Sequence, residues 1–247
     1  MAEQHGRFVG EEHPGTFDVV YPLVYQMMEL RGGLNIHRSQ NILRSGREVT
    51  TSNHDGFFDF FTVGIAKARA FKVPGKIELK SWKYGWIPGH FLEYMGAELF
   101  DRSDNASSLG PLLNCVRALR EREIFIHNFM ENTRKNSFAD FTPMEGAAYM
   151  AVQATTEMMQ CPLTPIGQST AETVFGQPIQ LIVGEPIYPP LGASKLKRPA
   201  KDKLVSELTE QAAAEVVILR DQSLELHHAG GGRPGEIVWN WDEQIAA

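Results

Sequence analysis

Apolar residues recur along the chain in two periods, one typical of buried strands and one typical of helices. Short β-like runs, of the length expected for strands, occur at 49–52, 76–79, 97–100, 123–127, 163–166 and 179–183. Between them, apolar residues repeat every three or four positions at 56–70, 86–94, 109–120, 144–158 and 201–219. This alternation predicts an α/β fold with a single sheet and helices packed against it.

The two ends of the chain differ from this middle part. Residues 1–15 are polar, whereas 17–30 carry an amphipathic helical stripe made of Phe17, Val20, Leu23, Val24, Met27 and Met28. Such a helix either packs on the domain or lies in a membrane interface, and the pattern leaves both open. We therefore expect a polar tail and an N-terminal amphipathic helix at 1–30, an α/β domain at 31–225 and a C-terminal tail at 226–247.

Composition narrows the function. A net charge of −6 on 247 residues argues against a nucleic-acid surface, which requires clustered positive charge. Two cysteines cannot form a disulfide framework and fit a reducing compartment. The first fifteen residues lack the apolar core of a signal peptide, and no stretch is apolar enough to span a bilayer. We expect a cytoplasmic protein, which still allows contact with a membrane surface.

The segment 51–59 (TSNHDGFFD) carries the first candidate chemistry. His54 and Asp59 would point about 140° apart on a continuous helix, because each residue turns roughly 100°. They can meet only if His54 lies in the turn before a helix whose first turns hold Asp59. Asp59 would then accept the proton of one ring nitrogen and leave the other as a base. The chain has no G-x-S-x-G turn and neither cysteine has a nucleophile's setting, so the base would activate a substrate hydroxyl.

Three further blocks follow in order. Arg102 ends the block GAELFDR, Phe129 begins FMENTR, and the block CPLTPI starts at Cys161. Together with N-H-x4-D at Asn53, these resemble the glycerolipid acyltransferase family, which includes the lysophosphatidic acid acyltransferases. That family carries N-H-x4-D, G-x5-R, F-P-E-G-T-R and P-x-x-P blocks in this order. The resemblance spans roughly residues 35–190.

The resemblance implies a role for each block. His54 would deprotonate the acceptor hydroxyl while Asp59 holds its tautomer. Arg102 and Arg134 would bind the acceptor phosphate, since a planar guanidinium matches phosphate oxygens in a bidentate way. Lys80 is a further candidate for the same anion. In the third block, Glu131 and Thr133 would shape the acceptor site.

The resemblance also implies the substrates. Acyl-CoA or acyl carrier protein would supply the acyl group as co-substrate, without a cofactor or a metal, and a lysophospholipid like lysophosphatidic acid would accept it. Met130 and Asn132 stand where the family has proline and glycine, which leaves the acceptor open to glycerol 3-phosphate, a glycolipid or another lipid alcohol. A lipid-binding relative without turnover is the other alternative. We expect peripheral contact with the inner face of a membrane.

Overall fold

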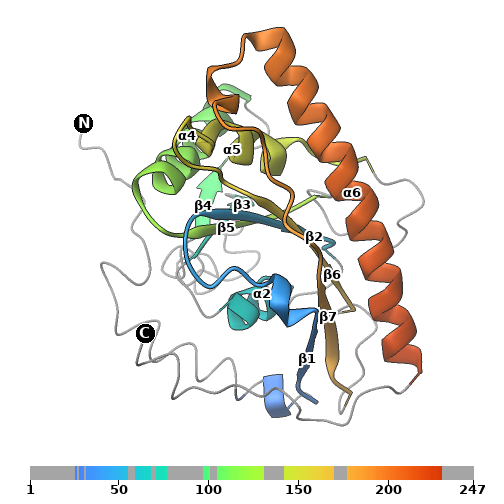
Figure 1. The fold of residues 1–247 in the computed structure, drawn as a ribbon. Helices are drawn as coiled ribbons and strands as arrows, with labels where there is room; N and C mark the ends of the chain where they lie inside the picture. Colours follow the sequence, from blue (N-terminus) through green and yellow to red (C-terminus); the bar gives the residue numbers. More distant parts are fainter. Residues whose placement is uncertain are drawn as a thin grey trace.

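A seven-stranded mixed sheet forms the centre of the molecule, in the order β1-β7-β6-β2-β5-β3-β4 (Figure 1). The computed structural model describes residues 26, 28–30, 32–54, 59–67, 71–76, 97–100, 105–130, 142–169 and 177–229. The strands are β1 (Leu34–His37), β2 (Glu48–Ser52), β3 (Phe71–Lys76), β4 (Ala97–Phe100), β5 (Phe125–Phe129), β6 (Leu163–Gln168) and β7 (Ile179–Val183). Strands β2 to β6 are parallel, whereas β7 pairs antiparallel with β6 and β1 runs parallel to β7.

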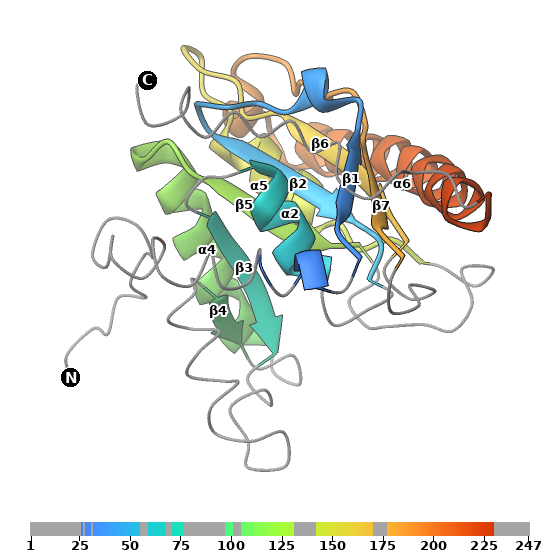
Figure 2. The same cartoon turned by 90° about the horizontal axis from the view of Figure 1, so that it is seen from below.

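Helices cover both faces of this sheet (Figure 2). The described elements are α2 (Asp59–Lys67), α4 (Asn105–Glu121), α5 (Gly146–Ala154), α6 (Arg198–His228) and the short 3-10 helices η1 (Ser39–Asn41) and η5 (Ala193–Lys195). One hydrophobic core joins β2, β5 and β6 to α4, α5 and α6. A second core, on the opposite face, joins the sheet to α2.

Side chains on β2 alternate between these two faces. Val49 packs in the core beneath α4, α5 and α6, while Thr50 and Ser52 face the α2 side and contact His127 there. Every residue of β2 is buried, because strands lie on both of its edges and helices on both of its faces. The polar side chains of this strand therefore have to find partners inside the protein. Glu48, Thr50 and Ser52 do so, whereas Thr51 Oγ1 has no hydrogen-bond partner among the described residues.

Helix α6 packs directly on β6 through a glycine. A Cβ atom at Gly167 would lie 2.2 Å from the backbone carbonyl carbon of Leu219, so only glycine permits this approach. A Cβ at Gly184 would lie 2.9 Å from a methyl group of the same leucine. Leu219 thus occupies a notch between β6 and the end of β7, and this contact fixes the long helix on the sheet.

The α/β sheet predicted from the sequence is confirmed. The strands at 97–100 and 179–183 have the predicted bounds, and helices cover the sheet as expected. The strand predicted at 123–127 lies two residues later, at Phe125–Phe129, where its pairing with Glu48–Ser52 sets the register. The predicted helix at 86–94 lies outside the described residues.

The strand predicted at 76–79 overlaps the observed strand at Lys76, and residues 77–79 lie outside the described residues. Strand β3 covers Phe71–Lys76 and contains Pro74, a residue that usually argues against a strand. Only Phe71 and Lys72 pair with β5, so Pro74 removes no hydrogen bond from that ladder. Strand β1 (Leu34–His37) was not predicted.

The boundaries at the two ends of the chain also differ from the prediction. Helix α6 extends to His228, so it crosses the expected start of the C-terminal tail at residue 226. Met28 of the amphipathic stripe is 1% exposed and packs in the core with Leu34 and Ile42. At this position the stripe belongs to the protein core; its other members lie outside the described residues. None of the described helices combines the length and apolar character needed to cross a membrane.

Candidate active site

Three neighbouring parallel strands end at the same edge of the sheet, and each carries a polar or aromatic residue there. Strand β2 leads to Asn53 and His54, β5 ends at Phe129 and β6 ends at Gln168. Ser52 pairs with Phe129 on one side and with Ile166 on the other, which aligns the three ends. In open α/β sheets, ligands bind in the crevice outside the carboxyl ends of the strands. This edge is therefore the candidate site.

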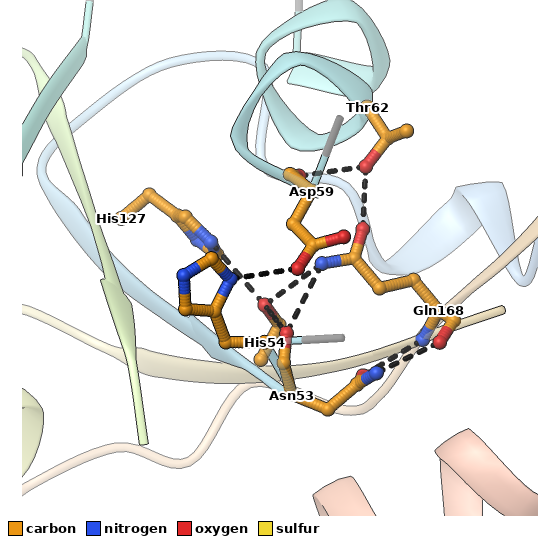
Figure 3. Close-up of polar contacts among 7 residues, drawn as sticks. Asn53, His54, Asp59, Thr62, His127 and Gln168 are labelled. Atoms are coloured by element: carbon orange, nitrogen blue, oxygen red, sulfur yellow. Dashed lines mark hydrogen bonds and ion pairs between the residues drawn. The ribbon is translucent and has the colours of Figure 1, made fainter. Parts of the chain in front are cut away.

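His54 and Asp59 meet in the geometry that the spacing required. His54 lies after β2, Asp59 is the first residue of α2, and His54 Nδ1 lies 2.8 Å from Asp59 Oδ2 (Figure 3). The side chain of Asp59 is fully buried, whereas His54 is 21% exposed. An ionised carboxylate only accepts hydrogen bonds, so Nδ1 carries the proton and Nε2 carries the lone pair. The start of α2 also favours a negative charge at Asp59.

A clamp of buried amides holds the turn that carries His54. The side chain of Asn53 donates from Nδ2 to the backbone oxygen of Gln168 at 2.8 Å and accepts from the Gln168 backbone N–H at 2.9 Å. Gln168 Nε2 in turn donates to Ser52 Oγ and to the backbone oxygen of Asn53. These bonds join the end of β6 to the turn after β2 and fix the backbone on which His54 stands.

The same glutamine also reaches helix α2. Gln168 Oε1 accepts from Thr62 Oγ1 at 2.5 Å, and that hydroxyl lies 2.7 Å from the backbone oxygen of Asp59 (Figure 3). Gln168 therefore touches both elements that present the His54–Asp59 pair. The distance between β2 and the first turn of α2 is set through this one side chain as well as through the pair itself.

An aromatic ring lies against the imidazole of His54. The ring centroids of His54 and Phe129 are 4.0 Å apart with an interplanar angle of 16°, which is a stacked arrangement. His127 meets Phe129 at 4.7 Å and 89°, an edge-on contact. Phe129, the last residue of β5, thus contacts both histidines. It limits the orientations that the His54 ring can take.

His127 is a neutral structural histidine. Burial, with smaller contributions from the nearby His54 and Lys67, lowers the pKa of His127 to about 3. Ser52 donates its proton to the backbone oxygen of Asn53, so it accepts from His127 Nε2, and Thr50 Oγ1 lies 2.9 Å from Nδ1. His127 is fully buried, and neither of these bonds joins it to a carboxylate. It is therefore not a second candidate for the base.

A buried ion pair anchors the other end of α2. Lys67 Nζ donates to Glu48 Oε1 at 2.6 Å, and both side chains are fully buried. The hydroxyl of Thr164 donates to the same oxygen at 2.5 Å. Asp59 and Lys67, the first and last residues of α2, thus both bind polar groups on the sheet side. This arrangement fixes the helix at its two ends.

The structure describes only part of the predicted site. It brings His54 and Asp59 together, whereas Lys80, Arg102, Glu131, Thr133 and Arg134 lie outside the described residues. Met130, which stands where the family has proline, is buried in the main core. Within the described part of the chain, no group of three or more His, Cys, Asp or Glu side chains could hold a metal ion.

Sequence reasoning did not assign a role to Phe129 or Gln168. Phe129 was recognised only as the first letter of the FMENTR block, and Gln168 lies just after the CPLTPI block. Each lies two residues beyond the carboxyl end of a predicted strand, and this position is the signal in the sequence that could have pointed to them.

Comparisons with known proteins agree with this fold. The family model for the acyltransferase domain matches residues 33–169, more than half of the chain. An uncharacterized acyltransferase of Schizosaccharomyces pombe is 29% identical over 169 residues, which cover 67% of this chain and 57% of the relative. The chain thus spans less than two thirds of that relative's length. The crystal structure of PlsC, the 1-acyl-sn-glycerophosphate acyltransferase of Thermotoga maritima, is similar with a TM-score of 0.53 and 18% identity, covering 84% of each chain.

The family model covers most of the mixed sheet and the segment that carries His54 and Asp59. These features therefore belong to an acyltransferase domain. The chain is a member of the acyltransferase family, and its fold is the one seen in PlsC. The resemblance to the glycerolipid acyltransferases noted in the sequence is confirmed at the level of family and fold.

Proposed function

We propose that this protein transfers a fatty acyl group from a thioester to the hydroxyl of a lysophospholipid, with His54 as the general base. The observation that carries the proposal is the bond between His54 Nδ1 and the buried Asp59 carboxylate. It leaves the lone pair on Nε2, on a partly exposed ring at the carboxyl edge of the sheet. A base in this setting can take a proton from a substrate that binds at this edge of the sheet.

The reaction is a direct transfer. His54 Nε2 takes the proton of the acceptor hydroxyl as its oxygen attacks the thioester carbonyl carbon. The carbon–sulfur bond then breaks, and the thiol of the carrier leaves with the proton returned by His54. An ester and a free thiol are the products. Asp59 stabilises the imidazolium that forms between the two steps and keeps the ring in one orientation.

The chain's two cysteines give no support to a covalent acyl-enzyme. Both are buried, and burial raises the pKa of Cys161 to about 12, with Glu48 adding to the effect and Arg47 opposing it. A thiol with so high a pKa is rarely the thiolate that attacks. Ser52 is fully buried and engaged with Asn53 and His127. These facts support attack by the substrate hydroxyl itself.

The acceptor proposed is a phosphate-bearing lysophospholipid, and the donor is acyl-CoA or acyl carrier protein. The motif resemblance assigns the phosphate to Arg102 and Arg134, with Lys80 as a third cation and Glu131 and Thr133 beside them. The structurally similar PlsC is named for a phosphate-bearing acceptor, 1-acyl-sn-glycerophosphate. Because the acyl chain and the product are amphiphiles, we expect the enzyme to work in peripheral contact with the inner face of a membrane.

One assay tests this proposal. Purified full-length protein is mixed with acyl-CoA or acyl carrier protein and a panel of acceptors, and the release of free thiol is followed. We expect release that depends on lysophosphatidic acid or a similar lysophospholipid. Equal release with a phosphate-free lipid alcohol would show that phosphate recognition is wrong. No release with any acceptor, with lipid binding retained, would show a binding protein without turnover.

Arg134→Ala sharpens the assignment of the phosphate. Loss of a charge-assisted contact costs about 1.5–3 kcal/mol, which corresponds to roughly tenfold or more in affinity. The apparent KM should rise for the acceptor and stay unchanged for the thioester. Equal effects on both substrates would show that Arg134 supports the fold instead.

A further inference from the structure

Phe129 differs from the other neighbours of His54 because it contacts the face of the imidazole. Asp59 reaches the ring at its edge, through Nδ1, whereas Phe129 stacks on the face at 4.0 Å and 16°. The clamp residues Asn53 and Gln168 act on the backbone around His54. Phe129 and Asp59 therefore approach the same ring in two perpendicular directions.

We propose that Phe129 is a positioning residue. The π face of its ring stabilises the imidazolium form of His54 that exists during the reaction. The inference rests on the proposed function, in which His54 becomes positively charged when it takes the hydroxyl proton. The face of an aromatic ring carries negative potential and attracts a cation that lies over it. A stacked imidazolium at 4.0 Å is within the range of this attraction, and it is partly shielded from water.

The second histidine that contacts Phe129 supports this arrangement. His127 meets the phenyl ring at 89°, held there by Thr50 and Ser52. A positive charge on His127 would oppose the charge that forms on His54. Burial keeps His127 neutral, with its pKa lowered to about 3. Of the two histidines that contact Phe129, His54 is partly exposed, whereas His127 is buried and stays neutral at ordinary pH.

Other titratable groups among the described residues surround these three rings. Asp59 and Lys67 belong to α2, Glu48 to β2 and His127 to β5, while the residues of β6 that face this side, Thr164 and Gln168, do not titrate. Lys67 is paired with Glu48. Among these side chains, histidine is the type whose ordinary pKa lies between pH 5 and 8, so His54 is the group whose titration an experiment in this range follows.

The test replaces Phe129 with mono-, di- and trifluorinated phenylalanine in the full-length protein. Fluorine withdraws electron density from the ring face and changes its size little. Two quantities are measured across the series: the midpoint of the His54 titration by NMR, and kcat and KM for acyl transfer. The midpoint reports on the ring pair even without turnover, so it separates a failure of this inference from a failure of the proposed function. The same series at Phe125, four residues earlier on β5, is the matched control.

We expect the midpoint to fall stepwise with fluorination at Phe129, by about 0.4–0.7 pH units in total. In parallel, kcat should fall about two- to fivefold, with the KM of the thioester unchanged and the acidic limb of the pH profile moved to lower pH. Phe129→Leu should lose more and Phe129→Tyr should retain most of the rate. An unchanged midpoint across the series, or the same response at Phe125, would overturn the inference.

Discussion

On β2, β5 and β6, alternate residues face opposite sides of one sheet, and the two sides differ in chemistry. The side covered by α4, α5 and α6 is mostly apolar, with Val49, Ile126 and Leu163 in its core and Thr51 as the buried polar residue of β2 there. On the side covered by α2 the same strands place Phe125 and Ile166 in a second apolar core, together with six fully buried polar residues: Glu48, Thr50, Ser52, His127, Thr164 and Gln168. The period-two alternation of a strand makes this division possible.

The difference shows how a small domain separates stability from chemistry. Burial of apolar area on the first side supplies favourable free energy without any specific partner. Each polar group on the second side instead requires a hydrogen bond, because an unpaired buried polar group costs about 1–3 kcal/mol. Those bonds restrict β2, β6 and α2 to one arrangement, and this arrangement places Asp59 against His54.

Breaking the buried ion pair of the α2 side should have the largest effect on stability. Lys67→Met leaves the Glu48 carboxylate without its cation, which typically costs about 3–5 kcal/mol. Urea unfolding measures the loss. The double variant Glu48→Gln with Lys67→Met removes both charges and should recover most of it. If the single and double variants are equally destabilised, the ion pair is not the reason for the loss.

His127 should make the protein less stable in acid. The unfolded chain binds a proton at this histidine near pH 6.5, whereas the folded protein resists protonation down to about pH 3. Its contribution is therefore fully present above pH 6.5 and is lost as the pH falls toward 3, by at most about 1.4 kcal/mol per pH unit. His127→Gln, which cannot take up the proton, should show a flatter loss between pH 6.5 and 4.5 in urea unfolding. Parallel curves would contradict this.

A change on the α6 side should lower stability without altering the chemistry. Gly167→Ala forces a methyl group against the backbone of Leu219, and overpacking of this kind costs about 1–3 kcal/mol. The melting temperature should fall, while kcat of the folded protein stays the same. Gly110→Ala is the control, because a Cβ there meets nothing within 4 Å. A fall in kcat with unchanged stability would show that the two sides are not separate.

The smallest expected effect comes from the clamp. Gln168→Leu removes the bonds to Ser52, Asn53 and Thr62 and loosens both elements that present the catalytic pair. We expect kcat to fall about tenfold, since a misplacement of catalytic groups raises the barrier by about 1.4 kcal/mol or more. Gln180→Leu is the matched control: it is also buried and hydrogen-bonded, but it lies on the other face of the sheet. Equal losses of kcat in both variants would show that Gln168 has no specific role in positioning the pair.

The sequence predicted the parts of the fold that depend on local patterns. Mostly apolar runs such as Ile179–Val183, in which Gln180 is the polar residue, were located correctly, because most side chains of a fully buried strand are apolar. The start of β3 at Phe71 was missed because a proline fits a strand only where no ladder hydrogen bond is lost. Pro74 meets this condition because pairing with β5 is confined to Phe71 and Lys72, which the local sequence does not reveal. Strand β1 depends on its pairing with β7, some 145 residues away, as in the contact between Asn35 and Gln180.

The site, like the fold, was predicted where it depends on residues that are close in sequence. His54 and Asp59 are close in sequence, and the turn between them follows from the spacing. Gln168 and Phe129 join the site only because β6 and β5 flank β2, and the strand order cannot be deduced from residue patterns. The polar residues of β2 gave no signal of their own, because a buried Thr or Ser looks like an exposed one until its partner is known.

The central claim, that His54 is the base and Asp59 its partner, is tested most directly by comparing acyl transfer and thermal unfolding in wild type, His54→Ala and Asp59→Asn. General-base catalysis contributes about 10²–10⁴-fold, so His54→Ala should lower the rate of thiol release by that factor while the melting temperature changes little. Asp59→Asn should also cost heavily, since an amide stabilises the wrong tautomer. Turnover close to wild type in folded His54→Ala protein would contradict the account.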